Sequence, residues 1–251
     1  MSGIEKIKEF SRLFYEKSNG IFLDPADENI ENTVCEINLS SDIVLILPRT
    51  KDLSNIRFYK NVKIIEINNY KIDRAKYKIL EQNANLLKQV THLQIWNNKQ
   101  DDLSLLKLFP NLTHLQISYI RKDESFFKEL ESLRRLQVLW LFSPSRLENL
   151  QFLRYVKSDL VALGIESTKA LKSFSGLGNV PSLQYLSLWG STYESAKFVT
   201  LDNTEGIESL QNLTELELKF YKFDMDDLER RLKGLKSLTN YTVDKNIYQN
   251  G

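Results

Sequence analysis

The chain has 251 residues, of which 42% are hydrophobic and 27% are charged, and this balance is that of a folded globular protein. Its formal net charge is +1, which excludes a strong overall electrostatic attraction to nucleic acid or to a membrane surface. Cys35 is the single cysteine, so no intrachain disulfide can form, and without a C-x-x-C pair a zinc or redox centre is not expected. We therefore expect no metal, no cofactor, no nucleic-acid partner and no membrane association.

Residues 1–54 precede the regular part of the chain. In residues 2–18, apolar side chains recur at helical spacing with charges between them, which predicts an amphipathic capping helix rather than a secretory signal. We accordingly expect a cytoplasmic protein. Two further segments, VCEINLSS (34–41) and DIVLILPRT (42–50), have the composition of strands, and the second is a candidate first strand of a sheet.

From residue 62 onward one hexapeptide pattern, L-x-x-L-x-L, returns eight times. The start-to-start spacing runs from 22 to 30 residues. The matching segments are VKIIEI (62–67), VTHLQI (90–95), LTHLQI (112–117), LQVLWL (136–141), LVALGI (160–165), LQYLSL (183–188), LTELEL (213–218) and LTNYTV (238–243). The fourth and sixth residues alternate as in a strand, so both point to one side. The residues before each motif follow a three-residue period, which suits a 3₁₀ turn or a short helix.

Over roughly residues 55–245 the chain resembles leucine-rich repeat proteins. The resemblance implies an α/β solenoid with a parallel sheet on its concave face and helices or 3₁₀ turns on its convex side. We expect one domain over 1–251, with a helical cap and irregular first strands at 1–54, about eight repeats at 55–245 and a tail at 246–251. Among the connections between motifs, residues 121–130 and 224–232 are candidates for full helices.

The repeats depart from the family at the position three residues after the last strand leucine. The family usually has Asn or Cys at this position, where it bonds the backbone of neighbouring turns. Only two of the eight residues there are Asn; the set is Tyr70, Asn98, Ile120, Pro144, Thr168, Ser191, Tyr221 and Asn246.

Alternation along the strands assigns the third, fifth and seventh residue of each motif to the concave face, pointing to solvent. All three tryptophans fall in these columns, and exposed aromatic patches usually mark interaction sites. Trp96, Trp140, Phe142, Tyr185 and Trp189 are the candidate anchors, with Tyr119 one residue farther along its strand. His92, Gln94, His114 and Gln116 are expected to give polar specificity, and Glu166, Glu215 and Glu217 to meet basic groups. A register error, or a covering loop, would instead bury some of these aromatic side chains.

The interval from Leu188 to Leu216 is longer than the other late intervals and is rich in loop-forming residues. Extra residues in a repeat become a loop on one side of the solenoid, often the binding side. A binding loop and a passive surface insertion are equally compatible with the sequence of residues 189–206.

Enzyme motifs are absent. The two histidines, His92 and His114, share one frame in adjacent motifs, but a catalytic zinc normally takes three protein ligands. The chain has no P-loop, no G-x-S-x-G and no H-E-x-x-H, so we expect neither catalysis nor a small-molecule substrate.

The interpretation is a protein-binding module whose partner is basic, because acidic residues outnumber basic ones in the concave columns. Two narrower forms are an immunity or antitoxin-type inhibitor of a toxin or enzyme, and a regulatory or scaffold subunit of an enzyme complex.

Overall fold

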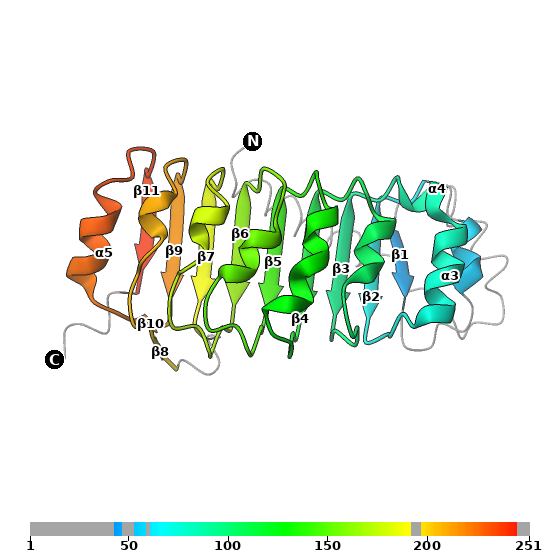
Figure 1. Ribbon diagram of the computed structural model, residues 1–251, viewed down its shortest axis with the longest axis horizontal. Helices are drawn as coiled ribbons and strands as arrows, with labels where there is room; N and C mark the ends of the chain where they lie inside the picture. The colour runs from blue at the N-terminus through cyan, green and yellow to red at the C-terminus, as the bar shows by residue number, and fades with distance from the viewer. Residues whose placement is uncertain (1–42, 47–52, 59–60, 192–196, 245–251) are drawn as a thin grey trace.

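The computed structural model describes residues 43–46, 53–58, 61–191 and 197–244. Within these ranges nine strands form one parallel sheet, which runs in chain order from β1 to β11 (Figure 1). Its members are β1 (Ile43–Ile46), β2 (Ile64–Asn68), β3 (His92–Trp96), β4 (His114–Ser118), β5 (Val138–Phe142), β6 (Ala162–Glu166), β7 (Tyr185–Trp189), β9 (Glu215–Lys219) and β11 (Asn240–Val243). Segment 42–50 contains β1, as predicted, whereas the expected helix at 2–18 and the candidate strand at 34–41 lie outside the described residues.

Each of the eight predicted motifs forms a strand, and neighbouring motifs pair in the same phase. Leu93 lies opposite Leu115, and Leu115 lies opposite Leu139, so the apolar positions form continuous rows across the sheet. A slip of one residue would exchange the two faces of a strand, and the repeated leucines prevent this because they must all reach the same core. The predicted register is therefore confirmed.

Helices and 3₁₀ turns cover a single face of the sheet (Figure 1). They are η1 (Leu53–Phe58), α3 (Arg74–Gln82), α4 (Ala84–Leu87), η2 (Ser104–Leu108), η3 (Glu124–Ser132), η4 (Gln151–Tyr155), η5 (Leu177–Asn179), η6 (Ile207–Ser209) and α5 (Met225–Leu232). The helix expected at 224–232 is confirmed, and the Asp224 carboxylate caps it by accepting from the N–H groups of Asp226 and Asp227. At 121–130 the structure instead has a 3₁₀ helix, η3, which begins after the capping residue Asp123.

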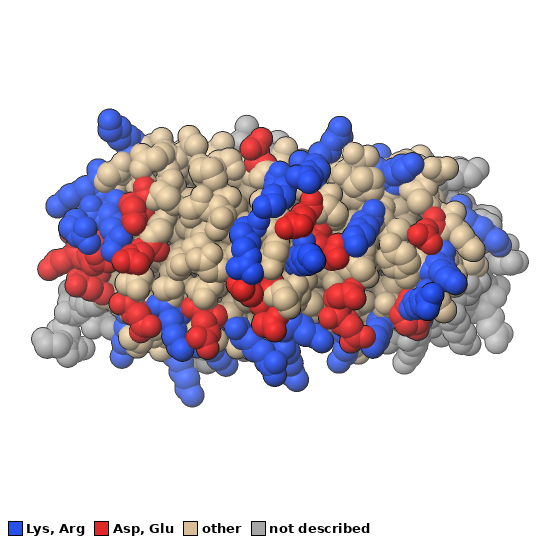
Figure 2. Space-filling model, in the orientation of Figure 1, with Lys and Arg blue, Asp and Glu red and all other residues tan. Residues whose placement is uncertain are grey.

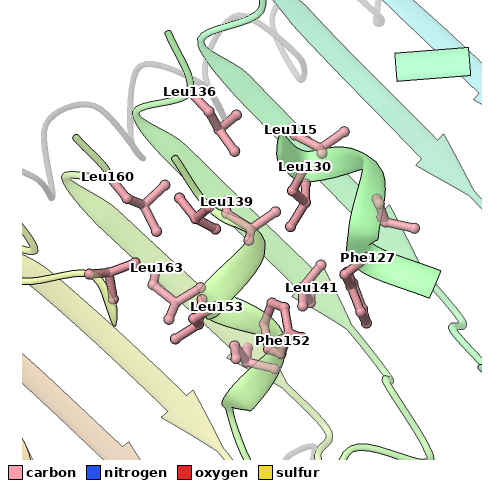
Figure 3. Close-up of a cluster of buried hydrophobic side chains, with 14 of the residues drawn as sticks. Leu115, Phe127, Leu130, Leu136, Leu139, Leu141, Phe152, Leu153, Leu160 and Leu163 are labelled. Atoms are coloured by element: carbon pink, nitrogen blue, oxygen red, sulfur yellow. The ribbon is translucent and has the colours of Figure 1, made fainter. Parts of the chain in front are cut away.

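The core lies between the sheet and this helical layer. In Figure 3, Leu139 of β5 points toward the layer formed by Leu130 of η3 and Leu153 of η4. Phe127 of η3 and Phe152 of η4 pack against each other in the same cluster, with ring centroids 4.5 Å apart. All five side chains are fully buried, and each contributes about 2 kcal/mol through removal of apolar area from water.

Other polar side chains replace the missing asparagines at the turns after the strands. The buried Gln100 amide donates to the Tyr70 carbonyl at 2.6 Å and accepts from the Ile72 N–H at 3.0 Å, which links two neighbouring turns. Farther along, the Thr168 hydroxyl donates to the Trp189 carbonyl at 3.2 Å and is also hydrogen-bonded to the buried hydroxyl of Tyr221. The irregular composition at this position therefore still satisfies buried backbone groups.

The long interval after β7 adds a second, two-stranded parallel sheet. Within it, β8 (Val199–Thr200) pairs with β10 (Tyr221–Lys222), and Leu201 is buried in the core. Residues 197–201 are thus part of the packed fold at the edge where the main strands end.

Candidate functional site

The concave face is the face of the nine-stranded sheet opposite the helices. In-phase pairing places its side chains in rows, because each residue lies beside the equivalent residue of the next repeat. One such row passes from Gln94 to Gln116, Trp140 and Gly164 on successive strands. The rows predicted from the sequence are therefore the rows of the structure.

Trp140 lies flat across the neighbouring strand because Gly164 has no side chain. A Cβ atom at Gly164 would be 2.3 Å from Cε3 of the indole ring, far inside the packing distance of two carbon atoms. The ring also packs against a small buried cluster of Val138, Ala162 and Tyr185. This cluster fixes the position of a half-buried tryptophan on the open face of the sheet.

A second tryptophan is fixed by charged groups. The Trp189 indole N–H and the Ser187 hydroxyl both donate to the same carboxylate oxygen of Glu217, at 3.0 and 2.8 Å. The Lys219 ammonium lies 2.6 Å from the other oxygen of Glu217 and 4.5 Å from the centre of the Trp189 ring. Burial alone would raise the pKa of Glu217, but the hydrogen bonds from Lys219, Ser187 and Trp189 hold it below its usual value. This carboxylate is therefore ionised and already paired.

Two other acidic side chains of this face are in surroundings that disfavour charge. Burial raises the pKa of Glu166, a hydrogen bond from Trp140 opposes the rise, and the nearby Glu217 charge adds to it. Burial raises the pKa of Glu66 to about 7, against a smaller opposing effect of a hydrogen bond with Asn68. The concave face is thus less negative in its unbound state than its formal charges suggest, and an approaching cation would favour ionisation of both groups.

His92 and His114 stack in adjacent strands, with ring centroids 4.1 Å apart and planes inclined by 13°. The hydroxyls of Thr91 and Thr113 each lie 2.8 Å from the Nδ1 atom of the following histidine. Next to this pair, the carbonyl oxygen of the Gln94 side chain is buried and accepts no hydrogen bond from the described residues. Among the described residues no three His, Cys, Asp or Glu side chains are arranged to hold a metal ion.

The expectation that the whole face points to solvent is wrong for three predicted contact residues. Gln94, His114 and Tyr185 retain only 2%, 7% and 8% exposure. Neighbouring strands of a sheet lie only about 4.8 Å apart, so large side chains on this face pack against one another.

The other predicted residues keep accessible surface. Tyr119 is 45% exposed. The half-buried residues are His92, Trp96, Gln116, Trp140, Phe142, Glu166, Trp189, Glu215 and Glu217. The sequence analysis chose aromatic, histidine, glutamine and glutamate residues from the concave positions of each motif. It therefore missed three residues at the same positions that hold the site in place, namely Gly164, Ser187 and Lys219.

Comparisons with known proteins define the class of fold. No family model matches the chain, and no curated protein matches its sequence. An internalin C2 from Listeria monocytogenes superposes with a TM-score of 0.51 at 17% identity, over 86% of this chain and 92% of that one. Another Listeria monocytogenes internalin has a TM-score of 0.48 at 19% identity, over 86% of this chain and 67% of that one. A Leptospira interrogans leucine-rich repeat protein has a TM-score of 0.45 at 15% identity, over 86% of this chain and 56% of that one. The chain has the leucine-rich repeat fold.

In the part of the chain that the structure describes, no helix has the length and apolar composition needed to cross a bilayer.

Proposed function

We propose that the chain is a protein-binding module, and that the half of the concave face formed by β5, β6, β7 and β9 is its contact surface. The proposed partner presents an apolar side chain to Trp140 and Trp189 and a basic side chain to Glu166. No catalytic role is proposed.

The observation that carries the proposal is the way both tryptophans are held. Trp140 is fixed by Gly164, and Trp189 is fixed by Glu217 and Lys219, yet both remain half-buried rather than part of the core. Aromatic side chains that are immobilised before binding lose little conformational entropy on binding, which is why such residues dominate binding energies.

The acidic groups support a basic partner. Glu166 is disfavoured as an anion in the free protein, so a partner Lys or Arg placed beside it would gain a charge-assisted hydrogen bond and restore its ionisation. Binding should therefore weaken at high ionic strength, mainly through the association rate.

The test is affinity capture from native lysate, followed by measurement of the dissociation constant with the purified partner. We expect the Trp140→Ala/Trp189→Ala variant to lose at least tenfold in affinity, because each removes a central aromatic anchor. Tyr241→Ala is the matched control, since Tyr241 is 47% exposed on the terminal strand and belongs to the core-facing row. Glu166→Gln should reduce the salt dependence of binding.

Circular dichroism and urea denaturation establish that the variants remain folded. A folded double variant that keeps the partner affinity of the wild type contradicts the proposal, as does a Tyr241→Ala variant that loses as much affinity. The two narrower forms differ in what happens to the partner. An inhibitor abolishes the activity of the enzyme or toxin that it binds, whereas a scaffold or regulatory subunit leaves it active in the complex.

A further inference from the structure

A hollow of about 500 Å³ lies where β3 and β4 end, at the edge of the sheet rather than on its concave face. Its wall includes Asn97, Lys99, Tyr119, Arg121 and Lys122. The volume falls within the range that small-ligand sites occupy. The proposed partner surface on β5 to β9 uses none of these residues.

Tyr119 presents its ring to this hollow from a backbone that is held in place. Its φ is +57°, in the left-handed region that bulky residues rarely adopt, and its N–H donates to the Phe142 carbonyl at 2.7 Å. At the equivalent turns after β2 and β3 the chain has Asn69 and Asn97, which suit this conformation. Tyr119 is 45% exposed and its ring packs against that of Phe142 in a T-shaped contact with centroids 5.8 Å apart, so part of the Tyr119 side chain remains accessible to a ligand.

Positive charge is concentrated around this ring. Among the described residues, no ion pair involves Lys99, Arg121 or Lys122. The one acidic residue of the wall, Asp101, is bound by Lys71 at 2.6 Å, on the neighbouring turn. Figure 2 shows Lys and Arg side chains projecting along the lower edge of the molecule, interspersed with Asp and Glu; this is the edge toward which the strand arrows of Figure 1 point. The wall of the hollow itself thus has three cationic side chains and one carboxylate that is already paired, although the formal net charge of the whole chain is only +1.

The floor of the hollow is already ordered. Gln100 is 3% exposed, and its side chain bonds the backbone of Tyr70 and Ile72. The Asn98 side chain accepts from the Gln100 N–H at 2.9 Å. A ligand would therefore meet an ordered floor, whereas the exposed Lys99 and Arg121 side chains would become ordered when it binds.

We propose that this hollow binds a nucleotide, with the base stacked on Tyr119 and the phosphate held by Lys99, Arg121 and Lys122. An exposed aromatic ring beside several cations matches this combination of a planar ring and an anion. A carboxylate ligand would use the cations but not the ring face. The nucleotide can be free or a unit of a single strand, since both present the same base and phosphate.

Isothermal calorimetry with uridine 5′-monophosphate, uridine and inorganic phosphate tests the site, and anisotropy of a labelled octauridylate tests the strand. We expect Tyr119→Asn to weaken monophosphate binding about tenfold and to leave phosphate binding unchanged, because loss of stacking affects only the base. This substitution keeps a residue suited to a positive φ. Arg121→Gln/Lys122→Gln should weaken the monophosphate and phosphate alike.

Lys233→Gln/Lys236→Gln is the matched control, since it removes two exposed cations elsewhere. The ligand is a single strand if octauridylate binds at least tenfold more tightly than the monophosphate and if the Tyr119 and Arg121/Lys122 variants lose this affinity. The ligand is a free nucleotide if octauridylate and the monophosphate bind with equal affinity. The proposal is overturned by the absence of binding, by phosphate binding as tightly as the monophosphate, or by equal losses in the control variant.

Discussion

Gly164→Ala is expected to displace Trp140 from the concave face. The added methyl group would lie 2.3 Å from the indole Cε3 and 2.5 Å from Cδ2 and Cζ3. Packed carbon atoms lie about 3.5–4.0 Å apart, so the ring must withdraw by at least ~1 Å or leave its position. Overpacking of this kind costs about 1–3 kcal/mol. A ring that leaves altogether exposes on the order of 100 Å² of apolar surface, or ~2.5 kcal/mol at about 25 cal/mol per Å².

Urea denaturation measures the stability, and tryptophan emission reports the environment of the ring. With a slope of about 2 kcal/mol per molar urea, a loss of ~2 kcal/mol lowers the midpoint by about 1 M. We also expect emission at longer wavelength and a loss of partner affinity close to that of Trp140→Ala.

The matched control is Gly178→Ala. A methyl group there would meet only the Ser209 side chain, at 3.6 Å, and stability should change by less than about 0.5 kcal/mol. In the double variant Trp140→Ala/Gly164→Ala the clash disappears, so the second substitution should cost almost nothing. Equal midpoints for the two glycine variants, with unchanged emission, would refute the inferred packing of Trp140.

Two further expectations concern stability. The folded pKa of Glu66, about 7, lies above its ordinary 4.5, so wild-type stability should fall as pH rises through this window. This difference between the two pKa values corresponds to a change of at most ~3 kcal/mol in the free energy of unfolding. Solvent screening of this partly exposed group reduces the change to about 1–2 kcal/mol. In urea titrations, the Glu66→Gln variant should therefore be more stable than the wild type by that amount at pH 8 and equally stable at pH 4. The same gain in stability at both pH values would contradict the raised pKa of Glu66. Thr168→Val leaves the buried Tyr221 hydroxyl without its bond and should cost about 1–3 kcal/mol, whereas Thr168→Ser should cost less, and equal losses would show that the hydroxyl is unimportant.

The strand register was predictable because it depends on a short-range pattern. Leu93 and Ile95 alternate within one motif, and the same alternation returns at Leu115 and Ile117, so the rows follow from the sequence. The short helix at 225–232 was predictable for a similar reason, since its capping residue Asp224 lies next to it in the chain.

Features that depend on neighbouring strands were less predictable. Gln94 and Tyr185 are buried on the concave face, where their cross-strand neighbours are more than twenty positions away in sequence. The significance of Gly164 appears only when it is seen beside Trp140, and the role of Gln100 only when it is seen beside Tyr70. Alternation assigns a side chain to a face, but the size of its cross-strand neighbour decides how much of it remains accessible.

The bond between Thr168 and Tyr221 has a consequence for cooperativity. In a solenoid each repeat contacts its immediate neighbours, so the array can open from its ends one repeat at a time. Thr168 follows β6 and Tyr221 follows β9, so this bond passes over the intervening repeat of β7. Strands β6, β7 and β9 should therefore exchange their amide hydrogens as one unit, and Thr168→Val should divide that unit into steps.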